Sequence, residues 1–121
     1  MSAEILDTSN GVVTVKLSGI LTFPEFTATQ ESITAFIRQY QGPGKVRILA
    51  LLKDFRGFGR EGDWGDTTVL DEYDPFVERM AIVGDKEWED QAQWFTLKGL
   101  RKTSIEYFLP ADLGKARAWL G

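Results

Sequence analysis

The alternation of apolar and polar residues predicts strands at the start of the chain. Within Val12–Ser18, apolar Val13, Val15 and Leu17 alternate with Thr14, Lys16 and Ser18, which is typical of a strand with one solvated face. Asn10-Gly11 just before it is a hairpin turn signal, so Glu4–Asp7 is predicted to be the antiparallel partner strand. Gly19 is predicted to end the second strand.

Short apolar runs predict three more strands further along the chain. Val46–Leu52 is nearly continuously apolar and bounded by glycines, which indicates a central strand buried on both faces. Met80–Val83 has the same character, and Ser104–Phe108 alternates weakly. The sheet should therefore have five strands.

Helical spacing of apolar residues fills the intervals between these strands. Thr22 is a suitable N-cap with Pro24 and Glu25 in the first turn, and the helix should stop at Gly42-Pro43-Gly44. Further helices are predicted to begin at about Asp66, at Gly84-Asp85 (ending at Gly99) and at Pro110.

The predicted order is β-β-α-β-α-β-α-β-α over one domain, residues 1–121. Strands that alternate with helices form βαβ units with right-handed crossovers. We therefore expect an α/β fold with a mostly parallel sheet and one antiparallel edge strand.

Composition narrows the possible chemistry. The 14 Lys and Arg against 18 Asp and Glu give a net charge of −4, which disfavours a general nucleic-acid binder. The sequence has no His and no Cys, which excludes Ser-His and Cys-His relays and zinc sites of the Cys/His type, and we expect no cofactor. No apolar run approaches a membrane span and Met1–Glu4 has no signal-peptide pattern, so a cytoplasmic protein is expected.

The segment Asp54–Asp66 is predicted to be an irregular loop and is the main candidate site. It holds four glycines together with Phe55, Phe58 and Trp64. It leaves the carboxyl end of the central strand, where ligands bind in α/β sheets. The aromatic residues could cap the core, close over an apolar pocket as a lid, or form a contact surface.

Two patterns in this segment suggest more specific chemistry. Gly57–Gly62 matches the dinucleotide fingerprint G-x-G-x-x-G, but three residues precede its first glycine and carboxylates crowd the following helix start. A flexible loop is the favoured interpretation. The acidic residues between Glu61 and Asp74 are interpreted as a solvated helix face, with a docking surface for a basic partner as the alternative.

Charged residues at two strand ends could support catalysis. Lys53-Asp54 and Asp85-Lys86 should lie close together, as a proton-transfer pair or as an exposed ion pair. No nucleophile is recognisable beside them, so we expect no enzyme. Trp88 shares a helix face with Ala92 and Phe95 and is expected in the core.

Four segments resemble the SpoIIAA-like family, a branch of the STAS superfamily that is also grouped with the CRAL-TRIO lipid-binding fold. They are Ser18–Thr22, Leu51–Phe58, Glu78–Trp88 and Phe108–Leu120. The resemblance implies a small bacterial domain of unassigned function. The phosphorylatable Ser or Thr of the better-known anti-sigma-factor antagonists has no counterpart in Phe55–Arg60, so a kinase-operated switch is not supported.

The favoured function is a non-catalytic domain that binds a protein partner or self-associates. The alternative is a carrier of a small apolar ligand, which predicts a cavity of about 300 Å³ or more beneath the aromatic loop. The predicted binding residues are Asp54, Phe55, Arg56, Phe58, Trp64, Asp85 and Trp88.

Overall fold

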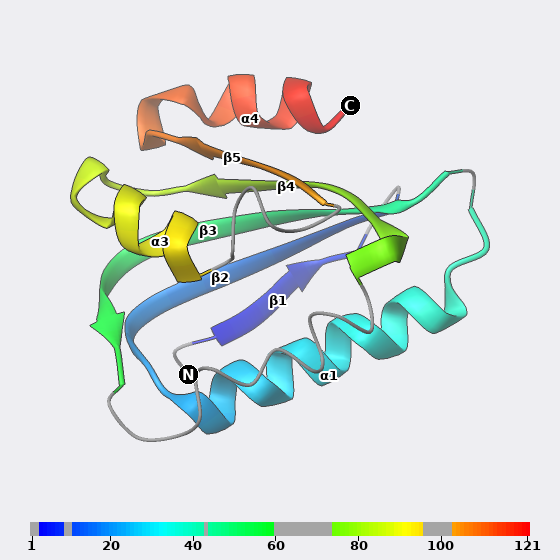
Figure 1. Cartoon of the computed structure of the whole chain (residues 1–121), viewed down its shortest axis with the longest axis horizontal. Coiled ribbons are helices and arrows are strands. Elements are labelled where there is room, and N and C mark those ends of the chain that lie inside the picture. Colours follow the sequence, from blue (N-terminus) through cyan, green and yellow to red (C-terminus); the bar gives the residue numbers. More distant parts are fainter. Residues whose placement is uncertain (1–2, 9–10, 43, 60–73, 96–102) are drawn as a thin grey trace.

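Five strands form one sheet in the order β1-β2-β3-β4-β5. The computed structural model describes residues 3–8, 11–42, 44–59, 74–95 and 103–121 (Figure 1). The strands are β1 (Ala3–Asp7), β2 (Val12–Leu21), β3 (Val46–Phe58), β4 (Val77–Val83) and β5 (Ser104–Phe108). β1 is antiparallel to β2, and the other three pairings are parallel. The mostly parallel sheet with one antiparallel edge strand is thereby confirmed.

The described residues contain three α-helices, α1 (Phe23–Gln39), α3 (Glu89–Phe95) and α4 (Leu113–Leu120). Short 3-10 turns precede β4, α3 and α4; they are η2 (Asp74–Phe76), η3 (Lys86–Trp88) and η4 (Pro110–Asp112). The helix predicted to begin at about Asp66 falls on residues 66–73, which lie outside the described part of the chain. None of the helices in the described part of the chain is long and apolar enough to cross a membrane.

The first helix begins where its capping residues predict. The Thr22 hydroxyl accepts a hydrogen bond from the Glu25 amide at 3.4 Å, and Pro24 lies in the first turn. The helix ends at Gln39, with Tyr40 as its C-cap, a few residues before Gly42.

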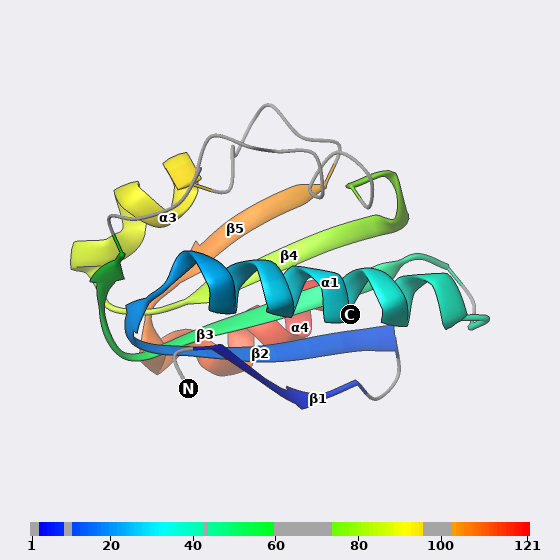
Figure 2. The ribbon, with the colours of Figure 1, turned by 90° about the horizontal axis from the view of Figure 1, so that it is seen from below.

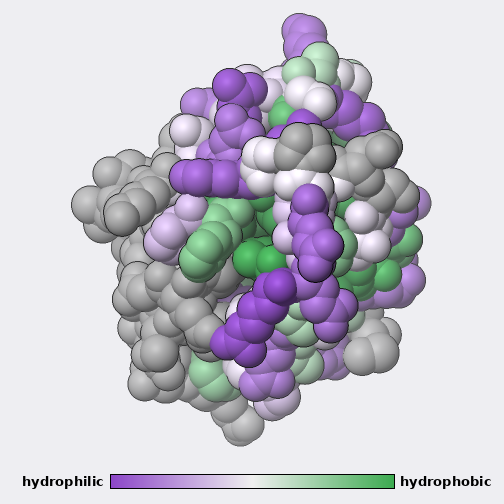
Figure 3. All heavy atoms as spheres, turned by 90° about the vertical axis from the view of Figure 1, so that its right-hand side faces the viewer, coloured by the Kyte–Doolittle hydropathy of each residue, from purple (hydrophilic) through white to green (hydrophobic). Residues whose placement is uncertain are grey.

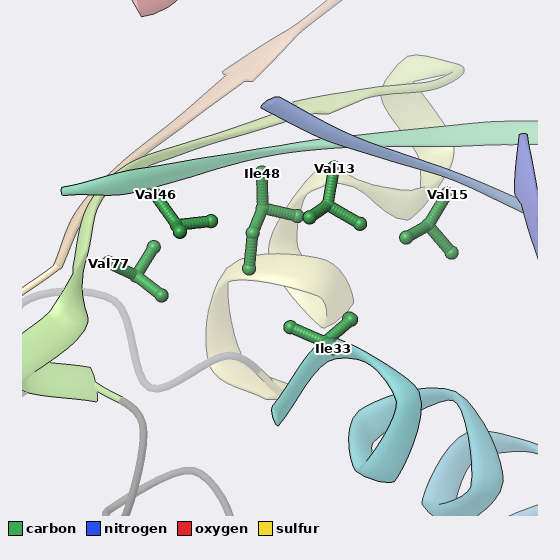
Figure 4. Packing of buried hydrophobic residues seen from close by; sticks show 6 residues of the cluster. All are labelled: Val13, Val15, Ile33, Val46, Ile48 and Val77. Carbon is green, nitrogen blue, oxygen red and sulfur yellow. The ribbon is translucent and has the colours of Figure 1, made fainter. Parts of the chain in front are cut away.

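The helices cover both faces of the sheet (Figures 1 and 2). On one face, Ile33 of α1 packs against Val13, Val15 and Ile48 (Figure 4). Ala92 of α3 covers the same face further along β3 and β4. On the opposite face, the helix α4 buries Ala116 and Leu120 against β3 and β4, as the spacing of its apolar residues predicts.

The second and third strands are longer than predicted. β2 continues through Gly19 to Leu21, and Asp54–Phe58 belongs to β3 instead of starting a loop. Gly19, Ile20 and Leu21 pair with Phe55, Gly57 and Phe58. In this stretch β3 uses two residues more than β2, so it carries two bulges.

The paired ends of β2 (Gly19–Leu21) and β3 (Asp54–Phe58) form a two-stranded ribbon, and two backbone angles show where it bends. Asp54 has φ 53° and Gly57 has φ 124°, both on the left-handed side of the map. The prediction that Gly19 ends the strand was wrong, because a glycine with φ 61° is accommodated at the bulge.

Two smaller boundaries also differ from the prediction. β4 begins at Val77 and not at Met80. Trp88 lies in the turn η3, immediately before α3, instead of inside a continuous helix.

Candidate functional site

Three aromatic side chains meet where β3 extends beyond its pairing with β4 and remains paired with β2 alone. Phe55 packs edge-on against Phe58 (ring centroids 5.2 Å apart) and against Trp88 (5.1 Å). Phe55 is 8% exposed, whereas Phe58 and Trp88 are half-buried. The bulges in β3 turn Phe55 and Phe58 onto the core with Leu21, so the interpretation that they cap the core is supported for Phe55.

Phe58 and Trp88 also wall an apolar recess of about 70 Å³ that is partly open to solvent. Its whole lining is apolar and comes from β2, α1, β3, β4, η3 and α3. The lining residues are Leu17, Leu21, Phe26, Ala50, Leu52, Phe55, Phe58, Met80, Ile82, Trp88 and Ala92.

The recess is smaller than a lipid-like ligand requires. Pockets for small organic ligands usually have about 300–1,000 Å³. The cavity predicted for a carrier is therefore not formed by the described residues at this position, because Phe55 fills the space under the ribbon.

The predicted charged residues do not join this apolar group. Asp54, Arg56 and Asp85 are exposed and do not line the recess. Trp64 lies outside the described residues. Of the seven predicted binding residues, the structure thus brings together Phe55, Phe58 and Trp88.

The other candidate motifs lose their support. Gly57 and Phe58 are strand residues, and the Gly59 amide donates to the Leu21 carbonyl at 2.7 Å. The first half of the G-x-G-x-x-G motif therefore takes part in strand pairing and does not form a phosphate-binding loop. Arg60–Gly62 lie outside the described residues. Lys53 and Lys86 are exposed, and the described residues hold no group of three or more potential metal ligands.

Tyr107 supports the turn beside the recess, and the sequence analysis did not single it out. Its hydroxyl donates to the Asp85 carbonyl at 2.6 Å and so ties β5 to the turn that carries Trp88. The pKa of Tyr107 is raised to about 12. Partial burial is the largest cause, and the negative charges of Asp85, Glu89 and Glu87 add to it. The alternation in Ser104–Phe108 places Ile105 and Tyr107 on one face and was the available signal.

This raised pKa predicts a loss of stability in alkali. The fold favours the neutral phenol, so its contribution is complete below pH 10 and disappears as the pH rises from 10 to about 12. The contribution should be on the order of 1 kcal/mol, because solvent screens a partly exposed group. Tyrosinate absorbance and urea unfolding of the wild type and Tyr107→Phe should show it; equal alkaline losses in the two proteins would contradict it.

Two arginines hold the end of α4 on the other face of the sheet. Arg47 donates to the carbonyls of Leu120 (3.0 Å) and Gly121 (2.7 Å). Arg79, which is paired with Arg47 in register, donates to the Trp119 carbonyl and lies over the Trp119 ring at 5.2 Å. Cations are favourable at a helix C-terminus, so these bonds fix α4 on the sheet.

The strand order and the helices on both faces define a single α/β domain with a mostly parallel sheet. The family model for SpoIIAA-like proteins matches residues 12–121, and the chain belongs to this family. No curated protein matches the chain.

A solved structure has the same fold. It is the crystal structure of an uncharacterised DUF3478-family protein with a SpoIIAA-like fold from Shewanella loihica PV-4. It is similar to this chain with a TM-score of 0.68 and 18% sequence identity, over 98% of this chain and 92% of that one. At this identity the similarity supports the fold.

Proposed function

We propose that this SpoIIAA-like domain is not an enzyme and that it binds a protein partner, which inserts one aliphatic side chain into the recess beside Phe58 and Trp88. The observation that carries the proposal is the lining of this recess, which is apolar throughout although the recess opens to solvent. Protein interfaces concentrate their affinity in such places, where an anchor side chain fills a desolvated pocket.

The size of the recess favours a side chain over a free ligand. A dry cavity of about 150 Å³ accepts benzene in another protein. The recess has about half that volume, 70 Å³, which suits the branched end of a Leu, Ile or Val side chain. The partner therefore has an exposed aliphatic residue in a segment that can reach the ribbon of β2 and β3.

Catalysis has less support at this position. An acid or base in a site works when it is placed against the substrate and its environment tunes its pKa. The recess offers no polar side chain, and Lys53, Asp54, Asp85 and Lys86 are exposed to water. Binding without chemistry is the function that these residues favour.

A cavity-filling variant tests the proposal without removing any contact. Ala92 is buried and lines the recess from α3, so Ala92→Val adds two methyl groups to the empty space. Its stability should stay within about 1 kcal/mol of the wild type. Ala28→Val, at an exposed position of α1, is the matched control for the lower helix propensity of Val.

The three proteins would be immobilised and panned with a phage-displayed random peptide library. Selected peptides should share an aliphatic anchor and bind the wild type and Ala28→Val equally. They should bind Ala92→Val at least tenfold more weakly. A failure to select peptides, or equal binding to Ala92→Val, would overturn the proposal.

Retention of a small apolar molecule is the alternative function predicted from the sequence; the apolar lining suits it, whereas the volume of 70 Å³ argues against it. Native mass spectrometry of the purified protein separates the two. An additional mass of a few hundred daltons, lost in Ala92→Val, would replace the proposed anchor by a ligand, and a dimer mass would identify a second copy as the partner.

A further inference from the structure

A second cavity lies at the opposite end of the sheet. It has about 200 Å³ and lies between the beginnings of β2 and β3 and the end of α4. Unlike the apolar recess, its lining is mixed; it consists of Asp7, Val12, Thr14, Arg47, Leu49, Arg117, Leu120 and Gly121. Figure 3 shows this end of the molecule, where hydrophilic residues surround a small hydrophobic area.

Thr14 is the first indication that the cavity holds a ligand. Its side chain is on the face of β2 that packs toward α4 and is only 6% exposed. Among the described residues its hydroxyl has no hydrogen-bond partner. A buried hydroxyl without a partner is costly, so a group in the cavity should bond to it.

Arg117 is the second indication, and it comes from a different element. It projects from the last turn of α4 and lines the same cavity. Its guanidinium has no ion pair or hydrogen bond within the part of the chain that the structure describes. Two donors from separate elements thus converge on one space.

The guanidinium groups around the cavity are donors suited to an anion. Arg47 contributes a second guanidinium, and its bonds to the Leu120 and Gly121 carbonyls offset the negative end of the α4 dipole. Asp7 is the only acidic side chain among the described lining residues, and the α-carboxylate of Gly121 at the end of the printed chain is met by the Arg47 guanidinium at 2.7 Å. Arg117 is therefore the cation in the lining for which the structure gives no bond to a carboxylate of the described residues. Arg117 is an exposed residue that lines the cavity, so it can meet an anion entering from solvent, while Thr14 lies deeper.

We propose that this cavity binds a small oxyanion, a phosphate or carboxylate group that accepts hydrogen bonds from Thr14 and Arg117. Guanidinium groups bind such oxygens with short, charge-assisted bonds. The volume of 200 Å³ admits a small metabolite and excludes a nucleotide-sized ligand with its base and sugar. The inference is independent of the protein-binding recess, which lies at the carboxyl ends of the strands.

The test uses the whole chain and two separate probes, inorganic phosphate and acetate, at constant ionic strength. Each is titrated while the backbone amide resonances are followed by NMR. Saturable shifts should centre on Thr14 and on the last turn of α4. Saturation by phosphate alone indicates a phosphate site, and saturation by acetate alone a carboxylate site.

Three variants make the result specific. Thr14→Val is nearly isosteric, so it should keep or raise the melting temperature while it weakens binding. Arg117→Gln should weaken binding about tenfold. Lys115→Gln removes a charge from the same helix outside the cavity and should bind like the wild type. Shifts that do not saturate, or equal weakening in the Arg117 and Lys115 variants, would overturn the proposal.

Discussion

Replacing Ile48 by Ala is expected to lower the free energy of unfolding by about 3 kcal/mol. Ile48 is 1% exposed and its side chain lies on the face of the sheet that α1 covers, in one cluster with Ile33 (Figure 4). Its neighbours Val13, Val46 and Val77 are held by the sheet and cannot move into the space that the truncation leaves. The loss therefore includes a cavity term besides the transfer of the side chain to water.

A graded series separates these two terms. Ile48→Val removes one methyl group and should cost about 1 kcal/mol. Ile20→Ala is the control, because Ile20 is 57% exposed in the β2 extension and should change stability by less than about 0.5 kcal/mol. Urea unfolding measures all three. A cost for Ile48→Ala no greater than that of Ile48→Val would mean that α1 can collapse onto the sheet, which the rigid strand contacts argue against.

The sequence predicts the sheet better than the ribbon that carries the site. Val46–Leu52 and Met80–Val83 have the apolar pattern of buried strands, and local pattern was enough to find them. Asp54–Phe58 has glycine and charge in place of that pattern. It is a strand because residues 19–21, more than thirty positions earlier, supply its hydrogen-bonding partner.

The start of β4 was hidden for a related reason. Glu78 and Arg79 interrupt its apolar run, so the pattern indicated a strand only from Met80. Arg79 nevertheless faces α4, where its charge is used at the helix end and its stem packs against Trp119. A charged residue with a partner from a distant helix cannot be distinguished from a surface residue by local sequence.

The candidate site was located in the right region with the wrong mechanism. The aromatic residues after the central strand do gather there, together with Trp88. The cavity size depends on how Phe55 packs after two bulges, and bulge positions follow from pairing register, which the sequence does not state. Thr14 was correctly predicted to be a strand residue, but the prediction that its face of the strand is solvated was wrong. Thr14 is 6% exposed because α4, about a hundred residues later, covers this face.

Gly84→Ala is expected to cost about 2–3 kcal/mol, because there is no space for a side chain at this position. A Cβ atom at Gly84 would lie 2.6 Å from the Tyr107 hydroxyl and 2.9 Å from the Leu52 Cβ. Gly84 itself is fixed, since its amide donates to the Phe108 carbonyl at 3.0 Å. Accommodation of the methyl group must therefore move β3 or β5 away from the end of β4.

A double-mutant cycle shows whether Tyr107 or Leu52 causes the steric cost of Gly84→Ala. Tyr107→Phe alone removes the bond to the Asp85 carbonyl and should cost about 1 kcal/mol. In the double variant Gly84→Ala/Tyr107→Phe, the closest contact is absent, so the total cost should be about 1 kcal/mol less than the sum of the single costs. Strict additivity would assign the whole penalty to Leu52 and the strand β3.

Gly114→Ala supplies the matched control for the change of residue type. Gly114 lies in α4 with open space around its Cα, so this substitution should stabilise the protein by about 0.5–1 kcal/mol. Opposite signs at Gly84 and Gly114 would show that contact, and not backbone entropy, determines the effect. Gly84 directly precedes Asp85 and the turn η3, so Gly84→Ala should also displace Trp88. A red-shifted tryptophan emission of Gly84→Ala would report that Trp88 has become more exposed at the recess.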